Sequence, residues 1–208
     1  MEHLRIAHAP LMRLFLLIAG LAVFLPVAPV LGQVLPDSSI AEPYETIEAS
    51  LGISFPGDQG VLGSAWDPGI GVLASAATPF YTGRLTGLVR MRPYSANADA
   101  PSFRAFSVHV GWDRPLVSVG RATLRGGFSL GTMRMSFDDN SEPGIRNESE
   151  FSVALSGSVV IRASGESAIL IGFSRERIFT SLPVDAGQWS VAYAHQFRTP
   201  DWIRRVIE

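Results

Sequence analysis

The segment Gln188–Phe197 constrains the fold of this chain more than any other stretch of its sequence. Its odd-numbered residues, from Trp189 to Phe197, are mostly large and apolar, whereas its even-numbered residues are small or uncharged. A β-strand projects successive side chains to opposite faces, so one face of this strand is apolar and aromatic at both ends. The other face is small and polar. This pattern is typical of a strand that meets lipid outside and a narrow polar lumen inside.

The N-terminus predicts export from the cytoplasm. Arg13 precedes the apolar run Leu14–Val30, and the small residue Gly32 follows it. This order predicts a secretory signal peptide over residues 1–32, cleaved after Gly32, with Met12 as an alternative start of the chain. Two prolines interrupt the run, which leaves its continuous part too short for a membrane helix. An exported chain without a later apolar run of about 20 residues is periplasmic, secreted or an outer-membrane barrel.

The composition excludes several classes of function. The chain has no cysteine, so it can form neither a disulfide framework nor a thiolate metal site. Its formal net charge is −2 and its basic residues form no cluster, so a nucleic-acid partner is not expected. The spacing of its histidines and carboxylates matches no metal-binding motif, and no glycine-rich phosphate loop follows a strand. We therefore expect no metal and no cofactor.

Segments of alternating polarity recur after residue 45, with turn-forming residues between them. Eight such segments predict an all-β fold, an eight-stranded antiparallel up-and-down transmembrane β-barrel over residues 46–197. An even number of strands leaves both ends of the barrel on one side of the membrane. Residues 33–45 have no period and are interpreted as a periplasmic leader. The predicted strands are 46–55, 70–78, 81–92, 103–112, 118–136, 148–162, 167–178 and 187–197.

The connections between these strands alternate between long and short. The long ones are 56–69, 93–101, 137–147 and 179–187, and the short ones are 79–80, 113–115 and 163–166. Outer-membrane barrels have long extracellular loops and short periplasmic turns, so this alternation favours the same architecture.

The chemistry of the polar face indicates which side of the sheet is inside. A face exposed to water is normally rich in long charged residues. Here the polar face is mostly Ser, Gly and Ala, which suits the crowded interior of an eight-stranded barrel. The apolar face is therefore predicted to lie in lipid. A secreted soluble barrel of the lipocalin kind, with the apolar face around an apolar ligand, remains an alternative. A general porin is disfavoured, since open channels need about 16 strands.

The signal peptide, the eight strands, the alternating loops and the aromatic-ended Gln188–Phe197 together resemble the small outer-membrane barrels of the OmpA/OmpX type. The resemblance covers about residues 46–197. It implies a place in the bacterial outer membrane, contact with outer-membrane lipid and lipopolysaccharide, and insertion by the barrel assembly machinery. In such barrels the last strand usually ends the chain on an aromatic residue. Here Arg198–Glu208 follows Phe197, and this segment is interpreted as a C-terminal periplasmic tail.

Charged residues on the predicted inner face form the main candidate site. Charges in a dry interior must find partners, because an unpaired buried charge is costly. We expect these residues to form a structural network of salt bridges that fills the lumen, and a narrow ion path along them is the alternative. The expected members are Glu48, Arg84, Arg90, Arg121, Arg125, Glu150, Glu166 and Glu176.

Ser107 and His109 are candidates for an enzymatic alternative. Some outer-membrane barrels of this size modify lipid A with a His/Ser pair and a carboxylate, and both residues fall on the inner face of one predicted strand. They lie about 7 Å apart along that strand, too far for direct activation of the serine. The other histidine of the mature chain, His195, is predicted to face lipid.

Because Ser107 and His109 lie too far apart, the favoured function is not enzymatic. It is a structural or surface-interaction role in which the long loops meet lipopolysaccharide, an envelope protein or an extracellular ligand.

Overall fold

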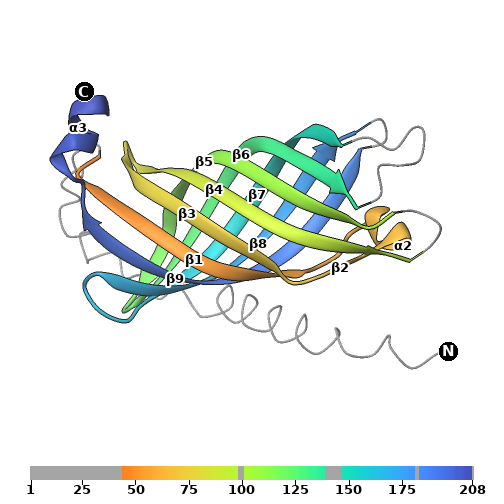
Figure 1. Cartoon of the computed structure of the whole chain (residues 1–208). Helices are drawn as coiled ribbons and strands as arrows, with labels where there is room; N and C mark the ends of the chain where they lie inside the picture. The colour runs from red at the N-terminus through yellow and green to blue at the C-terminus, as the bar shows by residue number, and fades with distance from the viewer. Residues whose placement is uncertain (1–43, 98–100, 139–146, 181–182, 208) are drawn as a thin grey trace. The chain divides into compact units, whose positions relative to one another are not determined.

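The computed structural model describes residues 44–97, 101–138, 147–180 and 183–207 (Figure 1). The predicted signal peptide, residues 1–32, lies outside the described residues, as does nearly all of the predicted leader, residues 33–45. Among the described residues, no helix is long and apolar enough to cross a membrane.

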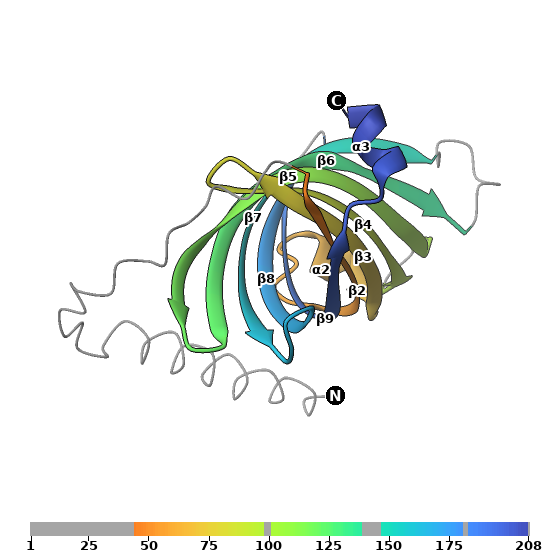
Figure 2. The same cartoon turned by 90° about the vertical axis from the view of Figure 1, so that its left-hand side faces the viewer.

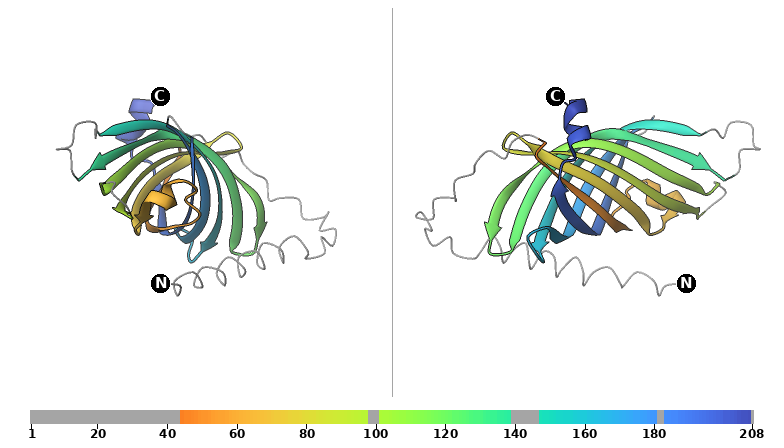
Figure 3. Two further views of the ribbon diagram at one scale, coloured as in Figure 1. Left: turned by 90° about the vertical axis from the view of Figure 1, so that its right-hand side faces the viewer. Right: turned by 60° about the vertical axis from the view of Figure 1, so that its left-hand side comes forward.

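Eight antiparallel strands form a closed ring, and the prediction of an eight-stranded barrel is confirmed. Each strand pairs with the next along the chain, and the last pairs with the first. Figure 2 and the left view of Figure 3 show the ring from its two ends. A ninth, short strand, β2 (Trp66–Pro68), pairs with one end of β4. Among the described residues, the helices are α2 (Leu62–Ala65) and α3 (Asp201–Ile207). The ring comprises β1 (Thr46–Pro56), β3 (Gly71–Phe80), β4 (Gly83–Ala96), β5 (Phe103–Val119), β6 (Ala122–Phe137), β7 (Glu148–Arg162), β8 (Ser167–Phe179) and β9 (Val184–Arg198).

The strands are staggered around the ring. Starting at Pro56, which lies opposite Gln188, the chain of paired residues passes through every strand and reaches Pro79 of β3. The β1–β3 register places Pro79 at the level of Thr46, ten residues before the starting point. A barrel closes only when its strands tilt by an amount linked to this stagger, and eight strands leave a lumen that side chains just fill.

The two ends of the barrel differ, as the sequence predicts. One end, here called the turn end, carries the tight turns 81–82, 120–121 and 163–166 together with the start of β1 and the end of β9. The other, the loop end, carries the connections that follow β1, β4, β6 and β8. The last of these spans only residues 180–183, because β9 begins at Val184 rather than at residue 187 as predicted.

The prediction of a turn at 113–115 is wrong. β5 continues to Val119, and the chain reverses at Gly120, which has a positive φ of 58°, before β6 begins at Ala122. The β5–β6 register shifts between Pro115 and Val117. Proline is tolerated in a sheet at an irregularity or an edge, where its missing N–H breaks no ladder bond. β4 pairs with β5 only as far as Asp113, so Pro115 meets both conditions.

The apolar face of the sheet points outward, and this prediction is confirmed. Leu51 and Leu155 have exposed fractions of 69% and 68%, whereas Ser54, Ser107 and Ser152 on the opposite face are at most 1% exposed. Large apolar side chains are exposed on every strand of the ring, whereas the side chains of Arg90, Arg92, His109, Arg125 and Glu176 lie inside. This arrangement excludes the lipocalin-like alternative, in which the apolar face of the sheet lines the lumen.

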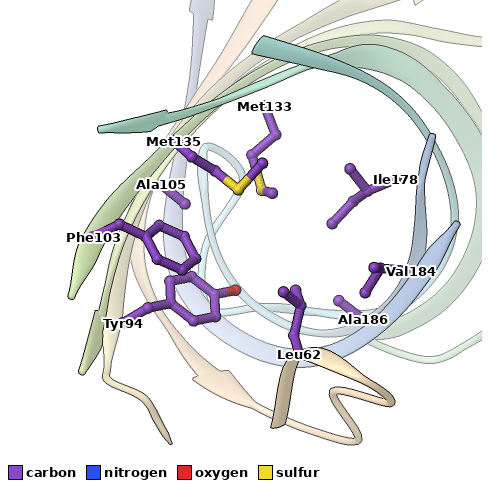
Figure 4. Packing of buried hydrophobic residues seen from close by; sticks show 9 residues of the cluster. All are labelled: Leu62, Tyr94, Phe103, Ala105, Met133, Met135, Ile178, Val184 and Ala186. Carbon is purple, nitrogen blue, oxygen red and sulfur yellow. The ribbon is translucent and has the colours of Figure 1, made fainter. Parts of the chain in front are cut away.

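An apolar cluster fills the loop end of the lumen (Figure 4). The Tyr94 ring stacks on Phe103, with centroids 4.5 Å apart, and Leu62 of α2 enters from the connection between β1 and β3. The amide of Gln59 holds this connection in place by donating a hydrogen bond of 2.7 Å to the Gly187 carbonyl. The sequence predicts only a loop here, because the four residues of α2 carry no periodic signal. We call this set the mouth cluster: Leu62, Tyr94, Phe103, Ala105, Met133, Met135, Ile178, Val184 and Ala186.

Candidate functional site in the barrel lumen

Two groups of charged side chains cross the lumen. The first, the turn-end cluster, consists of Glu48, Arg84, Asp113 and Arg125 from four different strands. Arg84 donates two hydrogen bonds of 2.9 Å to the Asp113 carboxylate and one of 2.5 Å to Glu48. The same oxygen of Glu48 accepts a hydrogen bond of 3.2 Å from Arg125. Paired, charge-assisted contacts of this kind offset the cost of burying the ions.

The second group, the central cluster, lies nearer the loop end and consists of Arg90, His109 and Glu176. One oxygen of Glu176 accepts a hydrogen bond from Arg90, and the other lies 3.2 Å from His109 Nε2. All three side chains are almost completely buried. Ser129 and Ser152 complete the surroundings of His109, each with a hydroxyl 3.4 Å from one of its ring nitrogens.

A cavity of about 90 Å³ separates the two clusters. Arg90 and His109 lie on its central side and Asp113 on its turn-end side. Its wall combines hydroxyl and amide groups with a larger share of apolar surface, and its volume has room for a few waters beside the polar groups. The remaining inward-facing lining residues include Thr86, Leu88, Ser129, Ser156, Ser174 and Gln188.

Five of the eight predicted charges meet inside the barrel: Glu48, Arg84, Arg90, Arg125 and Glu176. The other three do not join them. Arg121 and Glu166 lie in exposed turns, where the alternation of a strand no longer decides direction, so their expected inward placement is corrected. Glu150 is half-buried near the loop end of β7, and no ion pair joins it to another described residue.

Two lumen residues are absent from the set that the sequence predicts. The sequence places Asp113 in a turn, although this residue has the same parity as His109 and follows it by four residues in β5. Arg92 has the parity of Arg90, and its exposed fraction is only 3%. The alternation of side chains along each strand therefore places both residues on the inner face. For Asp113 this indication is masked by Pro115, which favours a turn in the local sequence.

The structure does not bring the candidate serine Ser107 into contact with His109. Ser107 accepts a hydrogen bond of 3.4 Å from Arg90 and makes no hydrogen bond with His109. His109 is 2% exposed, and its carboxylate neighbour Glu176 also pairs with Arg90. A serine nucleophile needs a base in reach and a substrate that can approach both. The mouth cluster lies between this site and the loop end.

His195 points outward at the turn end, as predicted. Its Nδ1 lies 3.3 Å from the Ser167 hydroxyl, which is 2.9 Å from the hydroxyl of Tyr193. Glu166 is 3.9 Å from His195 Nε2, and both side chains are substantially exposed. Pairs of this kind in solvent contribute little to stability.

Two solved structures of bacterial outer-membrane proteins resemble this arrangement of strands. Neisserial surface protein A matches with a TM-score of 0.54 and 16% identity, over 73% of this chain and 96% of that one. The outer-membrane protein OprG of Pseudomonas aeruginosa also matches with a TM-score of 0.54, at 7% identity, over 74% of this chain and 97% of that one. The fold is that of the small outer-membrane β-barrels. No protein-family model matches the sequence, and no curated protein does.

Proposed function

We propose that this chain is an integral outer-membrane protein of a Gram-negative bacterium, with a structural or surface-interaction role and a closed lumen. The inverted distribution of side chains carries this proposal. Large apolar residues cover the outside of the barrel, whereas the buried charged residues Arg90, His109 and Glu176 lie within it. Water would penalise such a surface, and a bilayer stabilises it, because each buried CH₂ group contributes about 0.8 kcal/mol.

The turn end faces the periplasm in this proposal, and the loop end faces the exterior. Both ends of the barrel chain, at Thr46 and Arg198, lie at the turn end, as expected for export behind a signal peptide over residues 1–32. Residues 33–45 and 198–208 then form the periplasmic leader and tail.

The lumen serves as a plug rather than a channel. The mouth cluster and the two charged clusters occupy successive levels of it, and an eight-stranded barrel is too narrow to add an open aqueous path. Purified protein in planar bilayers is therefore expected to give no stepwise conductance. Regular conductance steps, lost when the turn-end cluster is neutralised, would favour an ion path.

The surface for partners is the loop end. Val61 and Ile70 are 68% and 61% exposed on the connection between β1 and β3, which is held against the mouth by Gln59 and Leu62. Exposed apolar side chains on a fixed loop suit contact with lipopolysaccharide, an envelope protein or an extracellular ligand. Insertion by the barrel assembly machinery follows from the same architecture.

Single-cysteine labelling tests location and orientation together, because the chain has no cysteine of its own. Val61→Cys places a thiol on the loop end, and Gly165→Cys places one in a tight turn where a new side chain meets no atom within 4 Å. A membrane-impermeant maleimide is expected to label the Val61 variant in intact cells. It should label the Gly165 variant only after the outer membrane is permeabilised.

Cell fractionation and the electrophoretic shift on boiling provide the controls for folding. Both variants should appear in the outer-membrane fraction and change mobility when boiled. The reverse labelling pattern would contradict the orientation, and a soluble protein without a mobility shift would contradict the membrane location.

A further inference from the structure

We propose that Arg92 binds a small inorganic anion of halide size, such as chloride, inside the barrel. The proposal concerns the lumen alone and holds wherever the barrel resides. The site lies between the central cluster and the mouth cluster, beside the hydroxyl-bearing residues Ser54 and Tyr94.

Arg92 is a buried cation whose hydrogen bonds are incomplete. Its side chain is 3% exposed, and one terminal nitrogen donates a hydrogen bond of 2.9 Å to Ser54. Its Nε donates to no protein atom. A buried guanidinium presents five N–H donors, and each one left without an acceptor costs free energy.

No carboxylate neutralises this residue. Within the part of the chain that the structure describes, no Asp or Glu oxygen lies within 4.0 Å of Arg92. The nearest lumen acid is Glu176, which lines a small cavity together with Arg92. One oxygen of Glu176 pairs with Arg90 and the other contacts His109. In the turn-end cluster, both carboxylates, those of Glu48 and Asp113, are paired with Arg84 or Arg125. Arg92 is therefore a buried lumen cation that has no carboxylate partner within 4.0 Å among the described residues.

A space of suitable size lies against Arg92. It measures about 10 Å³, room for one water-sized sphere, and its wall carries several hydrogen-bond donors. A monatomic anion fits there, whereas phosphate or sulfate does not. Burial makes the attraction strong, because a charge pair interacts more strongly in the interior than in water. The polar lining residues are Arg90, Arg92, Tyr94, Ser107, Glu176 and Gln188.

Bromide provides a direct test with the wild-type protein. Crystals of the full barrel soaked in sodium bromide are expected to show an anomalous peak beside the Arg92 guanidinium. A bromide-free map with only a water at this position, and no peak after soaking, would overturn the proposal. This measurement does not depend on any variant folding.

Chloride dependence of stability provides a second test. We would measure unfolding by urea in detergent while chloride replaces gluconate, which is too large for the site, at constant ionic strength. Above the dissociation constant, the unfolding equilibrium constant is expected to fall about tenfold for each tenfold rise in chloride. Arg92→Met should abolish this dependence, and Arg134→Met, on the exposed outer face of β6, should retain it. Equal chloride dependence in all three proteins would contradict binding at Arg92.

Discussion

Glu176 Oε1 lies 3.2 Å from His109 Nε2, deep in the lumen, while the other oxygen of the same carboxylate accepts a hydrogen bond from Arg90. One buried acid thus joins β8 to β4 and β5 across the inside of the barrel. The backbone hydrogen bonds connect each strand only to its two neighbours in the sheet. The contact of Glu176 adds a link across the lumen, which the sheet does not provide.

Replacing Glu176 with glutamine keeps the shape of the side chain and removes its charge. Arg90 is then buried without a counter-ion, and we expect a loss of about 3–5 kcal/mol in the free energy of unfolding. Urea unfolding in detergent or lipid vesicles measures it. The matched control is Asp185→Asn, which removes an exposed partner 3.5 Å from Arg175 and should cost less than about 1 kcal/mol. Equal small losses for both variants would show that the central cluster is not stabilising.

A double-mutant cycle tests the turn-end cluster. Glu48 is the ion-pair partner of Arg125 at 3.2 Å, so the effects of Glu48→Gln and Arg125→Met on the free energy of unfolding should not add. We expect a coupling of about 0.5–3 kcal/mol. Arg125→Met with Arg90→Met serves as the control, because those residues belong to different clusters and should be additive within about 0.5 kcal/mol. Additive effects in the first cycle would show that the contact between Arg125 and Glu48 does not contribute to stability.

Two strand glycines differ in the space beside them. A Cβ at Gly131 would lie 2.7 Å from the ring of His109 and closer still to the carbonyl of Val108, whereas one at Gly87 meets nothing within 4 Å. Gly131→Ala is therefore expected to destabilise the barrel by about 1–3 kcal/mol through overpacking. Gly87→Ala should be neutral or slightly stabilising, because alanine loses less backbone entropy on folding. Comparison of the unfolding midpoints tests both, and a tolerated Gly131→Ala would contradict the close packing around His109.

The position of the bilayer can be located with arginine. Leu155 lies at the middle of β7 and is 68% exposed, and Val119 lies at the turn end of β5 and is 72% exposed. If the barrel spans a membrane, Leu155→Arg should cost about 2–4 kcal/mol and Val119→Arg about 0–1 kcal/mol in lipid vesicles. Both proteins should then be compared by the free energy of unfolding. Equal costs would mean that the middle of the barrel is not at the centre of the bilayer.

Local pattern predicted the parts of the fold that depend on local chemistry. The alternation from Trp189 to Phe197 is the alternation of β9, and the odd residues face outward as expected. The boundaries of β7 were also predicted correctly, at residues 148–162. The end of β5 was not, because Pro115 reads locally as a turn. Within β5, Pro115 is tolerated because the register with β6 shifts at this point and because β4 does not pair with this part of β5.

The sequence by itself determined that the chain forms a barrel with a small polar inner face, because side-chain direction in a strand follows from position alone. Only the tertiary structure decided which charges meet. Arg90 and Glu176 are 86 residues apart, and Arg125 and Glu48 are 77 apart. These pairs form because the strands are staggered and the sheet is closed, which sets their heights and brings opposite walls together. The same closure left Arg92 without a carboxylate oxygen within 4.0 Å among the described residues.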